Sequence, residues 1–272
     1  MVPMMGHKIA MNPAIFQDEN IGIAYGMGIT AENVASQWHV SREDQDAFAF
    51  ASHQKATAAI SAGEFSGEIS PFEVISHSPD LAGNTVRLKK TQVSNDEGPR
   101  ADTTLEVLAK LRPVFRTGGS VTAGNSSQMS DGAGAVMLAS EKAIKDYGLT
   151  PLARFVGFAV AGVKPDVMGI GPKEAIPKVL RQAGLTHNQL DWIELNEAFA
   201  AQALAVIKDL GLDPSKVNPL GGAIALGHPL GATGAIRTAT LVHGMRRRQQ
   251  KYGMVTMCIG TGMGAAGIFE SV

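Results

Sequence analysis

The chain has 272 residues, 44% of them hydrophobic and 18% charged, which is the composition of a globular protein with one large domain or two ordinary ones. Its formal net charge of −1 argues against nucleic-acid binding, and no stretch approaches the roughly 18 uncharged apolar residues of a membrane span. The first residues lack a secretory signal pattern, and one cysteine cannot form an internal disulfide. We therefore expect a cytoplasmic protein with neither nucleic-acid nor membrane partners.

Residues 1 to about 130 are predicted to form a region of helices and irregular loops. The first eight residues carry no helix or strand pattern, and we interpret them as the interior of a longer protein. The sequence Ser-Arg-Glu-Asp at 41–44 is similar to a capping box and predicts a helix that ends at Gly63.

The rest of this region is expected to contain one further helix. Residues 64–100 are rich in turn formers and are predicted to be irregular. A helix is expected from about Asp102 to just before Pro113, and a loop of small residues follows at 117–127. Three leucines of this helix are expected to point inward: Leu105, Leu108 and Leu111.

From Asp131 onward, segments with strand and helix character alternate along the chain. This alternation predicts an α/β layer structure with a mainly parallel or mixed sheet. Pro172 suits the first turn of one helix. We predict a buried strand at 133–139 with a helix to 148, strands at 152–163, 191–195, 254–259 and 265–270, and helices at 172–184, from 196, and at 231–249.

Three polar residues fall where predicted strands give way to turns or helices. The single cysteine, Cys258, follows an apolar run and precedes alternating glycines, which permit positive φ and close approach of another group. His228 lies in a Gly-His-Pro-x-Gly turn, and Asn196 follows a strand. Ligands of open α/β sheets collect beyond the carboxyl ends of strands, so one pocket is expected for all three residues.

Each of these residues also has an interpretation without function. Asn196 suits a helix N-cap, His228 a structural histidine, and Cys258 a small buried hydrophobe. The loop at 118–127 fits either a flexible connection or a surface for a pantetheine arm. Arg100 fits either a phosphate contact or an exposed side chain.

Two other kinds of site have little support in the sequence. The glycines match neither the phosphate loop nor the dinucleotide fingerprint. Seven histidines without paired spacing and one cysteine predict no metal site.

Three motifs in the second half resemble those of the thiolase family in order and spacing. They are Asn-Glu-Ala-Phe-Ala at 196–200, Gly-Gly-Ala-Ile-Ala-Leu-Gly-His-Pro-Leu-Gly at 221–231 and Cys-Ile-Gly-Thr-Gly at 258–262. Residues 28–35 and 122–127 resemble the family's middle region, so the resemblance covers essentially the whole chain. It implies the layered αβαβα thiolase architecture and acyl transfer between 3-oxoacyl-CoA and coenzyme A.

The resemblance also implies roles for individual residues. Cys258 corresponds to the acid/base cysteine, and His228 to the histidine that activates the nucleophile and helps hold the thioester oxygen. Asn196 would position a water in that oxyanion site, and the N–H of Gly260 would serve a second one. We expect nearby donors to lower the pKa of Cys258. The implied coenzyme A and acyl contacts are Arg100, Ala123, Ser127, Phe115, Met168 and Phe199.

The chain departs from the family pattern in one respect. Thiolases carry their acyl group on a second cysteine in the N-terminal third, and this sequence has no other cysteine. We expect a chain that lacks most of the first core domain and exposes apolar faces. It would then comprise a loop domain at 1–130, a remnant of that core domain at 131–150 and the second core domain at 151–272.

Three functional hypotheses follow from the resemblance. The first is a thiolase that is inactive alone, with coenzyme A as co-substrate and no resident cofactor. The second is a non-catalytic coenzyme A-binding remnant, or one half of a split thiolase. A ketosynthase-like enzyme is disfavoured, because such enzymes carry histidine where Cys258 stands. The resemblance implies a homo-oligomer for full-length members of the family and leaves the assembly of this chain open.

Overall fold

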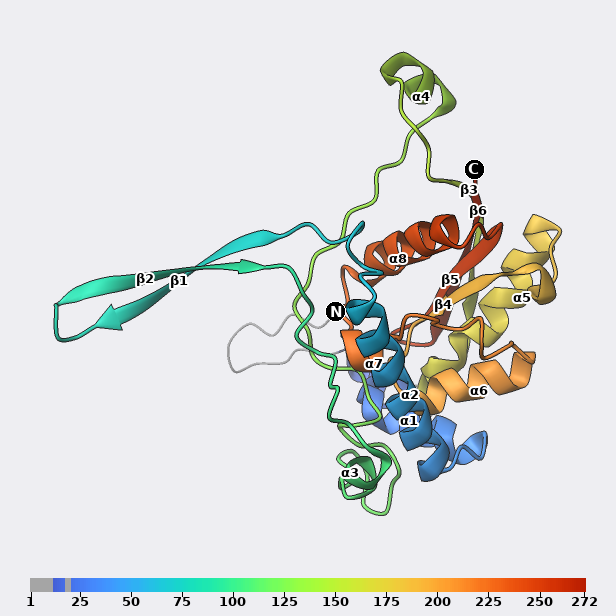
Figure 1. Cartoon of the computed structure of the whole chain (residues 1–272). Coiled ribbons are helices and arrows are strands. Elements are labelled where there is room, and N and C mark those ends of the chain that lie inside the picture. The colour runs from blue at the N-terminus through green and yellow to red at the C-terminus, as the bar shows by residue number, and fades with distance from the viewer. Residues whose placement is uncertain (1–11, 18–20) are drawn as a thin grey trace.

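The computed structural model describes residues 12–17 and 21–272 and is built around one mixed β-sheet (Figure 1). The strand order is β3-β6-β5-β4; β4 runs parallel to β5, and the other neighbours are antiparallel. The four strands are β3 (Ala153–Gly162), β4 (Trp192–Leu195), β5 (Tyr252–Ile259) and β6 (Met263–Ser271). The α/β class with a mixed sheet is as predicted.

Helices pack on both faces of this sheet. Alternation along the strands places Ile193 and Met254 against α5 (Gly171–Ala183) and α6 (Ala200–Leu210). Trp192 and Val255 point to the other face, where α8 (Thr233–Arg247) lies. Two buried clusters therefore enclose the sheet.

The helix predicted from residue 196 begins at Ala200, but the predicted ends at Gly148 and Gly184 are confirmed because they rest on local signals. Gly184 closes α5 in the left-handed conformation with φ of 66°. Pro172 lies in the first turn of the same helix. Helix α4 (Glu141–Tyr147) begins after Ser140, whose hydroxyl accepts a hydrogen bond from the Ala143 amide.

The N-terminal half contributes helices that pack beside the sheet domain. The predicted helix after Ser41 is α2 (Arg42–Ser61), and the Ser41 hydroxyl accepts the Asp44 N–H at 3.0 Å. The expected helix near Asp102 is shorter than predicted, because only Leu108 of its leucines is buried and Leu105 is exposed. The remaining helices are η1 (Pro13–Phe16), η2 (Ile21–Ala24), α1 (Met27–Gln37), α3 (Leu105–Ala109), η3 (Pro165–Ile170), η4 (His187–Gln189) and α7 (Ala223–Leu226).

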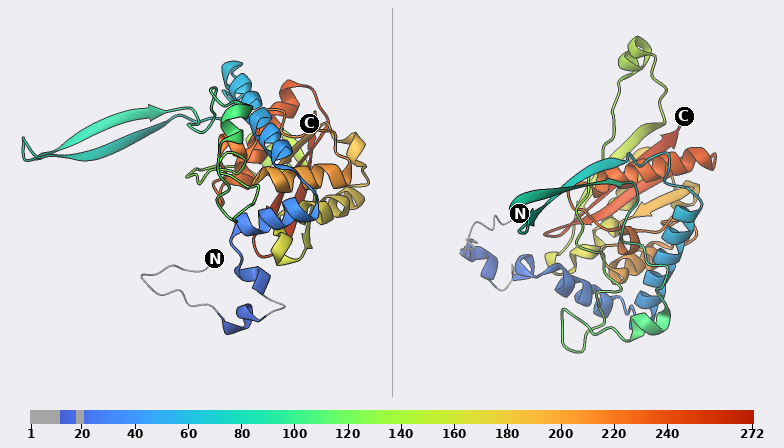
Figure 2. Two further views of the ribbon diagram at one scale, coloured as in Figure 1. Left: turned by 90° about the horizontal axis from the view of Figure 1, so that it is seen from below. Right: turned by 60° about the vertical axis from the view of Figure 1, so that its left-hand side comes forward.

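Residues 64–100 are not irregular throughout, as predicted, but contain a long β-hairpin. Its strands, β1 (Phe72–Asp80) and β2 (Thr85–Val93), pair in antiparallel register and project from the body (Figure 2). Nearly every hairpin residue is exposed on both faces, although Phe72 and Val74 in β1 and Val86 and Leu88 in β2 alternate with polar residues. The alternation is short and lies among the turn formers Pro71, Pro79 and Gly83, which favour an irregular segment.

The predicted buried strand at 133–139 is wrong. This segment is an exposed connection that leads out to α4, away from the sheet (Figures 1 and 2). Val136, Met137 and Leu138 are 47%, 85% and 86% exposed. Its apolar composition predicts burial, but no strand in the described residues pairs with it.

Apolar side chains are also exposed on the edge strand β3, at Phe155, Phe158 and Val160. The prediction that the chain exposes apolar faces is therefore confirmed at β3. The expectation about the first eight residues lies outside the described part of the chain. None of the helices in the described residues combines the length and apolar character of a membrane span.

Candidate active site

The parallel strands β4 and β5 end side by side, and two of the predicted site residues follow from them. Leu195 pairs with Thr256, and the Asn196 N–H donates to the Thr256 carbonyl at 2.9 Å. Cys258 lies two residues further along β5. The carboxyl edge of the sheet therefore brings the backbone around Asn196 and Cys258 together, as expected for an α/β site.

Asn196 contacts His228 directly. Its Nδ2 lies 3.3 Å from His228 Nε2, and its Oδ1 is buried without a hydrogen-bond partner. Helix α6 begins at Ala200 with Phe199 as N-cap, so the N-cap interpretation of Asn196 is wrong. A 1% exposed amide with a free acceptor is instead suited to hold a small polar ligand.

His228 lies in the turn before α8 and is held from its other ring nitrogen. Nδ1 lies 2.7 Å from the Thr233 hydroxyl, which also contacts the Pro229 carbonyl at 2.8 Å. Burial, followed by the charge of Arg237, lowers the pKa of His228 below its ordinary value. The imidazole is therefore neutral near pH 7 and available as a base.

Cys258 is half-buried, and burial raises the pKa of its thiol to about 11. The expected lowering of this pKa is therefore wrong, because the cost of burying a thiolate outweighs the stabilisation by the local backbone. The thiol is a proton donor near neutral pH. No hydrogen bond joins it to Asn196 or His228 among the described residues.

The glycines after Cys258 have different reasons to be glycine. Gly262 adopts φ of 102°, and a Cβ on Gly264 would lie 2.6 Å from the Pro172 nitrogen. Gly260 is exposed, and a Cβ there would meet nothing within 4 Å. Close backbone approach, as expected from the glycine pattern, therefore occurs at Gly262 and Gly264 but not at Gly260.

The loop at 120–127 is ordered against the Asn-Glu-Ala-Phe segment. The Ser127 N–H donates to the Ala198 carbonyl at 3.0 Å, and the Ala200 N–H donates to the Asn125 carbonyl at 2.9 Å. This places Ser127 beside the site, while Ala123 lies exposed in the same loop. The interpretation of residues 118–127 as a simple flexible loop is thus wrong for its second half.

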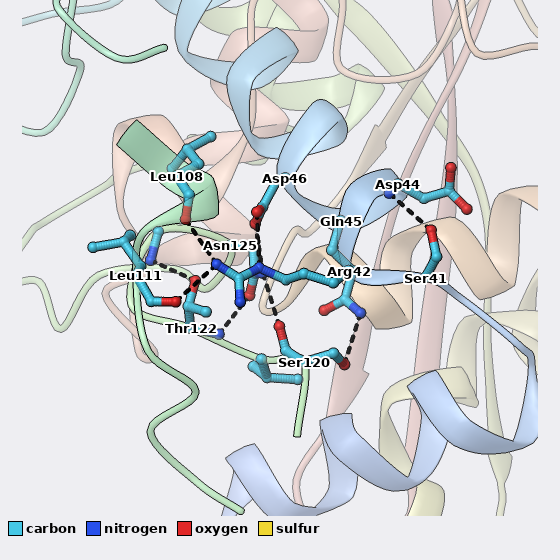
Figure 3. A network of polar contacts seen from close by, with 12 residues as sticks. Ser41, Arg42, Asp44, Gln45, Asp46, Leu108, Leu111, Ser120, Thr122 and Asn125 are labelled. Carbon is cyan, nitrogen blue, oxygen red and sulfur yellow. Dashed lines mark hydrogen bonds and ion pairs between the residues drawn. The ribbon is translucent and has the colours of Figure 1, made fainter. Parts of the chain in front are cut away.

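Side chains from α2 hold this loop in place (Figure 3). Asn125 accepts the Thr122 N–H at 2.8 Å and donates from Nδ2 to Asp46 at 2.9 Å. Asp46 also binds Arg42 at 2.8 Å, and Arg42 in turn donates to the Leu108 carbonyl. The network joins α2, α3 and the loop into one unit.

Of the other residues expected to contact coenzyme A or the acyl group, the structure brings only some together. Phe115 and Phe199 meet edge to face, with ring centroids 6.0 Å apart. Met168 is buried in η3. Arg100 is exposed, and its backbone N–H donates to His53 Nδ1 at 3.1 Å.

Glu197 lies inside the Asn-Glu-Ala-Phe-Ala motif, but no role was predicted for it from the sequence. In the structure it holds the segment after β4 in place. Its buried carboxylate accepts hydrogen bonds from Ser52 (2.7 Å), Asn218 (2.8 Å) and the Ile224 N–H (3.2 Å). These contacts tie the segment after β4 to α2 and α7. The signal was its position next to Asn196, but its partners lie up to 145 residues away.

A second buried carboxyl lies two residues before Asn196. Glu194 accepts the Trp192 indole N–H at 2.6 Å and lies 3.5 Å from the guanidinium of Arg237. Burial raises the pKa of Glu194 to about 7, and the arginine only partly opposes this. The pair connects β4 to α8, the helix that follows the turn carrying His228.

In the described residues, no group of three or more histidine, cysteine or acidic side chains is arranged to hold a metal ion. The described side chains at the sheet edge are an imidazole, an amide and a thiol.

Comparison with known proteins identifies the family of the chain. Residues 8–142 match the family model of the thiolase N-terminal domain, and residues 149–271 match that of the thiolase C-terminal domain. The 3-ketoacyl-CoA thiolase of Bacillus subtilis (strain 168) is 53% identical over 270 residues, covering 99% of this chain and 68% of its own length. The peroxisomal 3-ketoacyl-CoA thiolase B of Rattus norvegicus is 56% identical, covering 90% of this chain and 57% of its own length.

Solved structures show the same fold. Human mitochondrial 3-ketoacyl-CoA thiolase in complex with CoA superposes with a TM-score of 0.86 at 46% identity, covering 99% of this chain and 65% of the human chain. The Bacillus anthracis acetyl-CoA acetyltransferase gives a TM-score of 0.85 at 46% identity, covering 90% of this chain and 60% of that one. The chain thus spans about three fifths to two thirds of the length of these relatives, and it belongs to the thiolase family.

Proposed function

We propose that this chain carries the proton-transfer part of a thiolase site that moves an acyl group between 3-oxoacyl-CoA and coenzyme A. The observation that supports this most strongly is the contact between Asn196 and His228 at the sheet edge where Cys258 also lies. The unpaired, buried Oδ1 of Asn196 leaves an acceptor for a water or ligand beside the imidazole.

In the proposed cleavage direction, Cys258 acts first as an acid. A free thiolate of the nucleophilic cysteine, supplied from outside this chain, attacks the 3-oxo carbon and becomes acylated as the bond between C2 and C3 breaks, and the electron pair stays on C2 as the enolate of acetyl-CoA. The protonated thiol of Cys258 donates its proton to that carbon. The resulting thiolate then takes the proton of the coenzyme A thiol, whose sulfur attacks the acyl group and expels the carrier cysteine as its thiolate.

The other groups stabilise charge on oxygen. His228 activates the acyl carrier and, with a water held by Asn196, holds the thioester oxygen; the Gly260 N–H serves the second oxyanion. Donors fixed in such positions each supply roughly 3 kcal/mol in enzymes of this kind.

Coenzyme A is the proposed ligand of the neighbouring surface. The loop with Ala123 and Ser127 is held against Ala198, and the Phe115–Phe199 pair lies beside the same segment. One of the structural relatives is described as a complex with CoA. We assign Arg100 to the same ligand and Met168 to the wall of the acyl pocket, with no resident cofactor.

The sole cysteine of the sequence has the acid/base role, so none remains to carry the acyl group. We therefore propose that the chain alone completes no acyl transfer, and that turnover needs a second cysteine from another polypeptide segment. A cytoplasmic location and a homo-oligomeric complete enzyme are part of the same proposal.

Deuterium exchange tests the proton-transfer role without the acyl carrier. The chain in D₂O with millimolar acetyl-CoA should speed incorporation of deuterium into the acetyl methyl group, measured by NMR. Cys258→Ala should abolish the acceleration, and intact mass should show no acyl adduct. Exchange that survives Cys258→Ala, or stable acylation of Cys258, would overturn the proposal.

A further inference from the structure

The hydroxyl of Thr233 bridges His228 and the start of α8. Its Oγ1 lies 2.7 Å from His228 Nδ1 and 2.8 Å from the Pro229 carbonyl oxygen. Thr233 is 1% exposed, so water does not compete for these contacts. The Pro229 carbonyl also accepts the N–H groups of Ala232 and Thr233 at 2.9 Å, which fixes the turn.

The number of protons in this arrangement decides the form of the imidazole. A hydroxyl has one proton, and a carbonyl oxygen can only accept, so Thr233 must donate to Pro229. Towards His228 it can then only accept, and Nδ1 must carry the hydrogen. In the neutral ring this leaves a lone pair on Nε2, which faces the amide Nδ2 of Asn196 at 3.3 Å.

We propose that Thr233 is a positioning residue that holds His228 as the Nδ1–H tautomer and so makes Nε2 the basic nitrogen of the site. The catalytic purpose of this tautomer rests on the function proposed above, but the tautomer itself does not. Free imidazole side chains favour the opposite form, with hydrogen on Nε2. The protein must therefore supply the preference, and Thr233 is the side chain in contact with Nδ1.

The same geometry separates two roles during proton transfer. When Nε2 gains a proton, Nδ1–H keeps its bond to Thr233 unchanged. Only Asn196 has to respond, because its Nδ2 is a donor that cannot pair with a second donor. Rotation of the amide would present Oδ1, which is buried and without a partner. Thr233 thus fixes the ring while Asn196 adapts to its charge.

Long-range proton–nitrogen NMR of ¹⁵N-histidine-labelled chain tests the proposal directly. At pH 8 we expect His228 to show a protonated Nδ1 and an unprotonated Nε2. Thr233→Val, which removes the acceptor at similar volume, should shift the population to the Nε2–H form. Thr233→Ser should retain the Nδ1–H form.

A matched control is available on the same helix. The Thr238 hydroxyl donates to the Gly234 carbonyl four residues earlier at 2.7 Å, like Thr233 to Pro229, but lies away from His228. Thr238→Val should therefore leave the tautomer unchanged. In the deuterium-exchange assay, Thr233→Ser and Thr238→Val should keep the Cys258-dependent rate within about threefold.

The outcomes separate this inference from the proposed function. An Nε2–H tautomer in the unaltered chain, or an Nδ1–H tautomer that persists in folded Thr233→Val, overturns the role of Thr233. If Thr233→Val does not fold, the tautomers of the unaltered chain and of Thr233→Ser still decide. The correct tautomer without any deuterium exchange would overturn the proposed function and leave the positioning role intact.

Discussion

Gly171 and Gly264 meet backbone to backbone where α5 starts against the sheet. A Cβ on Gly264 would overlap the Gly171 carbonyl group, and one on Gly171 would overlap Met263 and lie 2.6 Å from the Gly264 nitrogen. Gly264 is paired with Cys258 across the β5–β6 hairpin. The contact therefore fixes how closely α5 approaches β6, the strand that pairs with the one carrying the thiol.

Gly264→Ala should destabilise the chain because neither backbone can move without shifting α5 or β6. We expect a loss of about 1–3 kcal/mol in the free energy of unfolding, measured by urea denaturation. Gly260→Ala is the matched control, since a Cβ there has open space, and it should change stability by less than about 0.5 kcal/mol. Equal effects of the two substitutions would contradict the close contact.

Glu197→Gln tests the carboxylate that links three segments around the site. The Glu197 Oε2 accepts hydrogen bonds from Ser52 and from the Ile224 N–H, so an amide NH₂ in its place would face two donors. We expect a loss of about 2–3 kcal/mol in the free energy of unfolding. Glu141→Gln, at an exposed position, serves as control. Unchanged stability of Glu197→Gln would show that the network is not needed.

Local signals account for what the sequence predicted correctly. Ser41, Ser140 and Gly184 mark helix ends through bonds or backbone angles that involve their near neighbours. The strands β4 and β5 could be predicted because their buried residues are continuous runs. Because the ends of β4 and β5 could be predicted, so could the placement of Asn196 and Cys258 at one edge of the sheet.

The errors concern properties that depend on distant partners. The segment 133–139 has the composition of a buried strand, but burial needs a neighbouring strand that composition cannot reveal. The β1–β2 hairpin has no buried face, and its short runs of alternating residues lie among turn formers that favour an irregular segment. The direction of the Cys258 pKa shift depends on how tightly other segments enclose the thiol, which only the packing decides.

The buried Glu194 should make stability depend on pH. Its carboxyl has a pKa of about 7 in the folded chain, raised from the ordinary value of 4.5. The folded state therefore binds more protons in this interval, so the stability contribution is complete below about pH 4.5 and is lost as the pH rises through about 7. The difference corresponds to about 3 kcal/mol.

Glu194→Gln removes this titration while keeping an oxygen for the Trp192 indole. The free energy of unfolding of the variant minus that of the unaltered chain should therefore increase between pH 4.5 and pH 8. Urea denaturation at a series of pH values measures this difference. Glu174→Gln, in an exposed position on α5, should show no such trend. A difference that is constant, or that increases toward low pH, would contradict the assignment.

The single cysteine allows its pKa to be measured without interference from other thiols. Alkylation by iodoacetamide requires the thiolate, and burial raises the pKa of Cys258 to about 11. In the folded chain the reaction should therefore be slow at pH 8 and should accelerate about tenfold per pH unit until the pH approaches 11. Chain unfolded in urea provides the control, because its thiol titrates near 8.5 and its rate should level off above about pH 9. Intact mass measures the extent of reaction at each time point. A plateau below pH 9 in the folded chain would mean that the thiol is an ordinary or activated one, and that Cys258 enters the proposed cycle as a thiolate instead of as an acid.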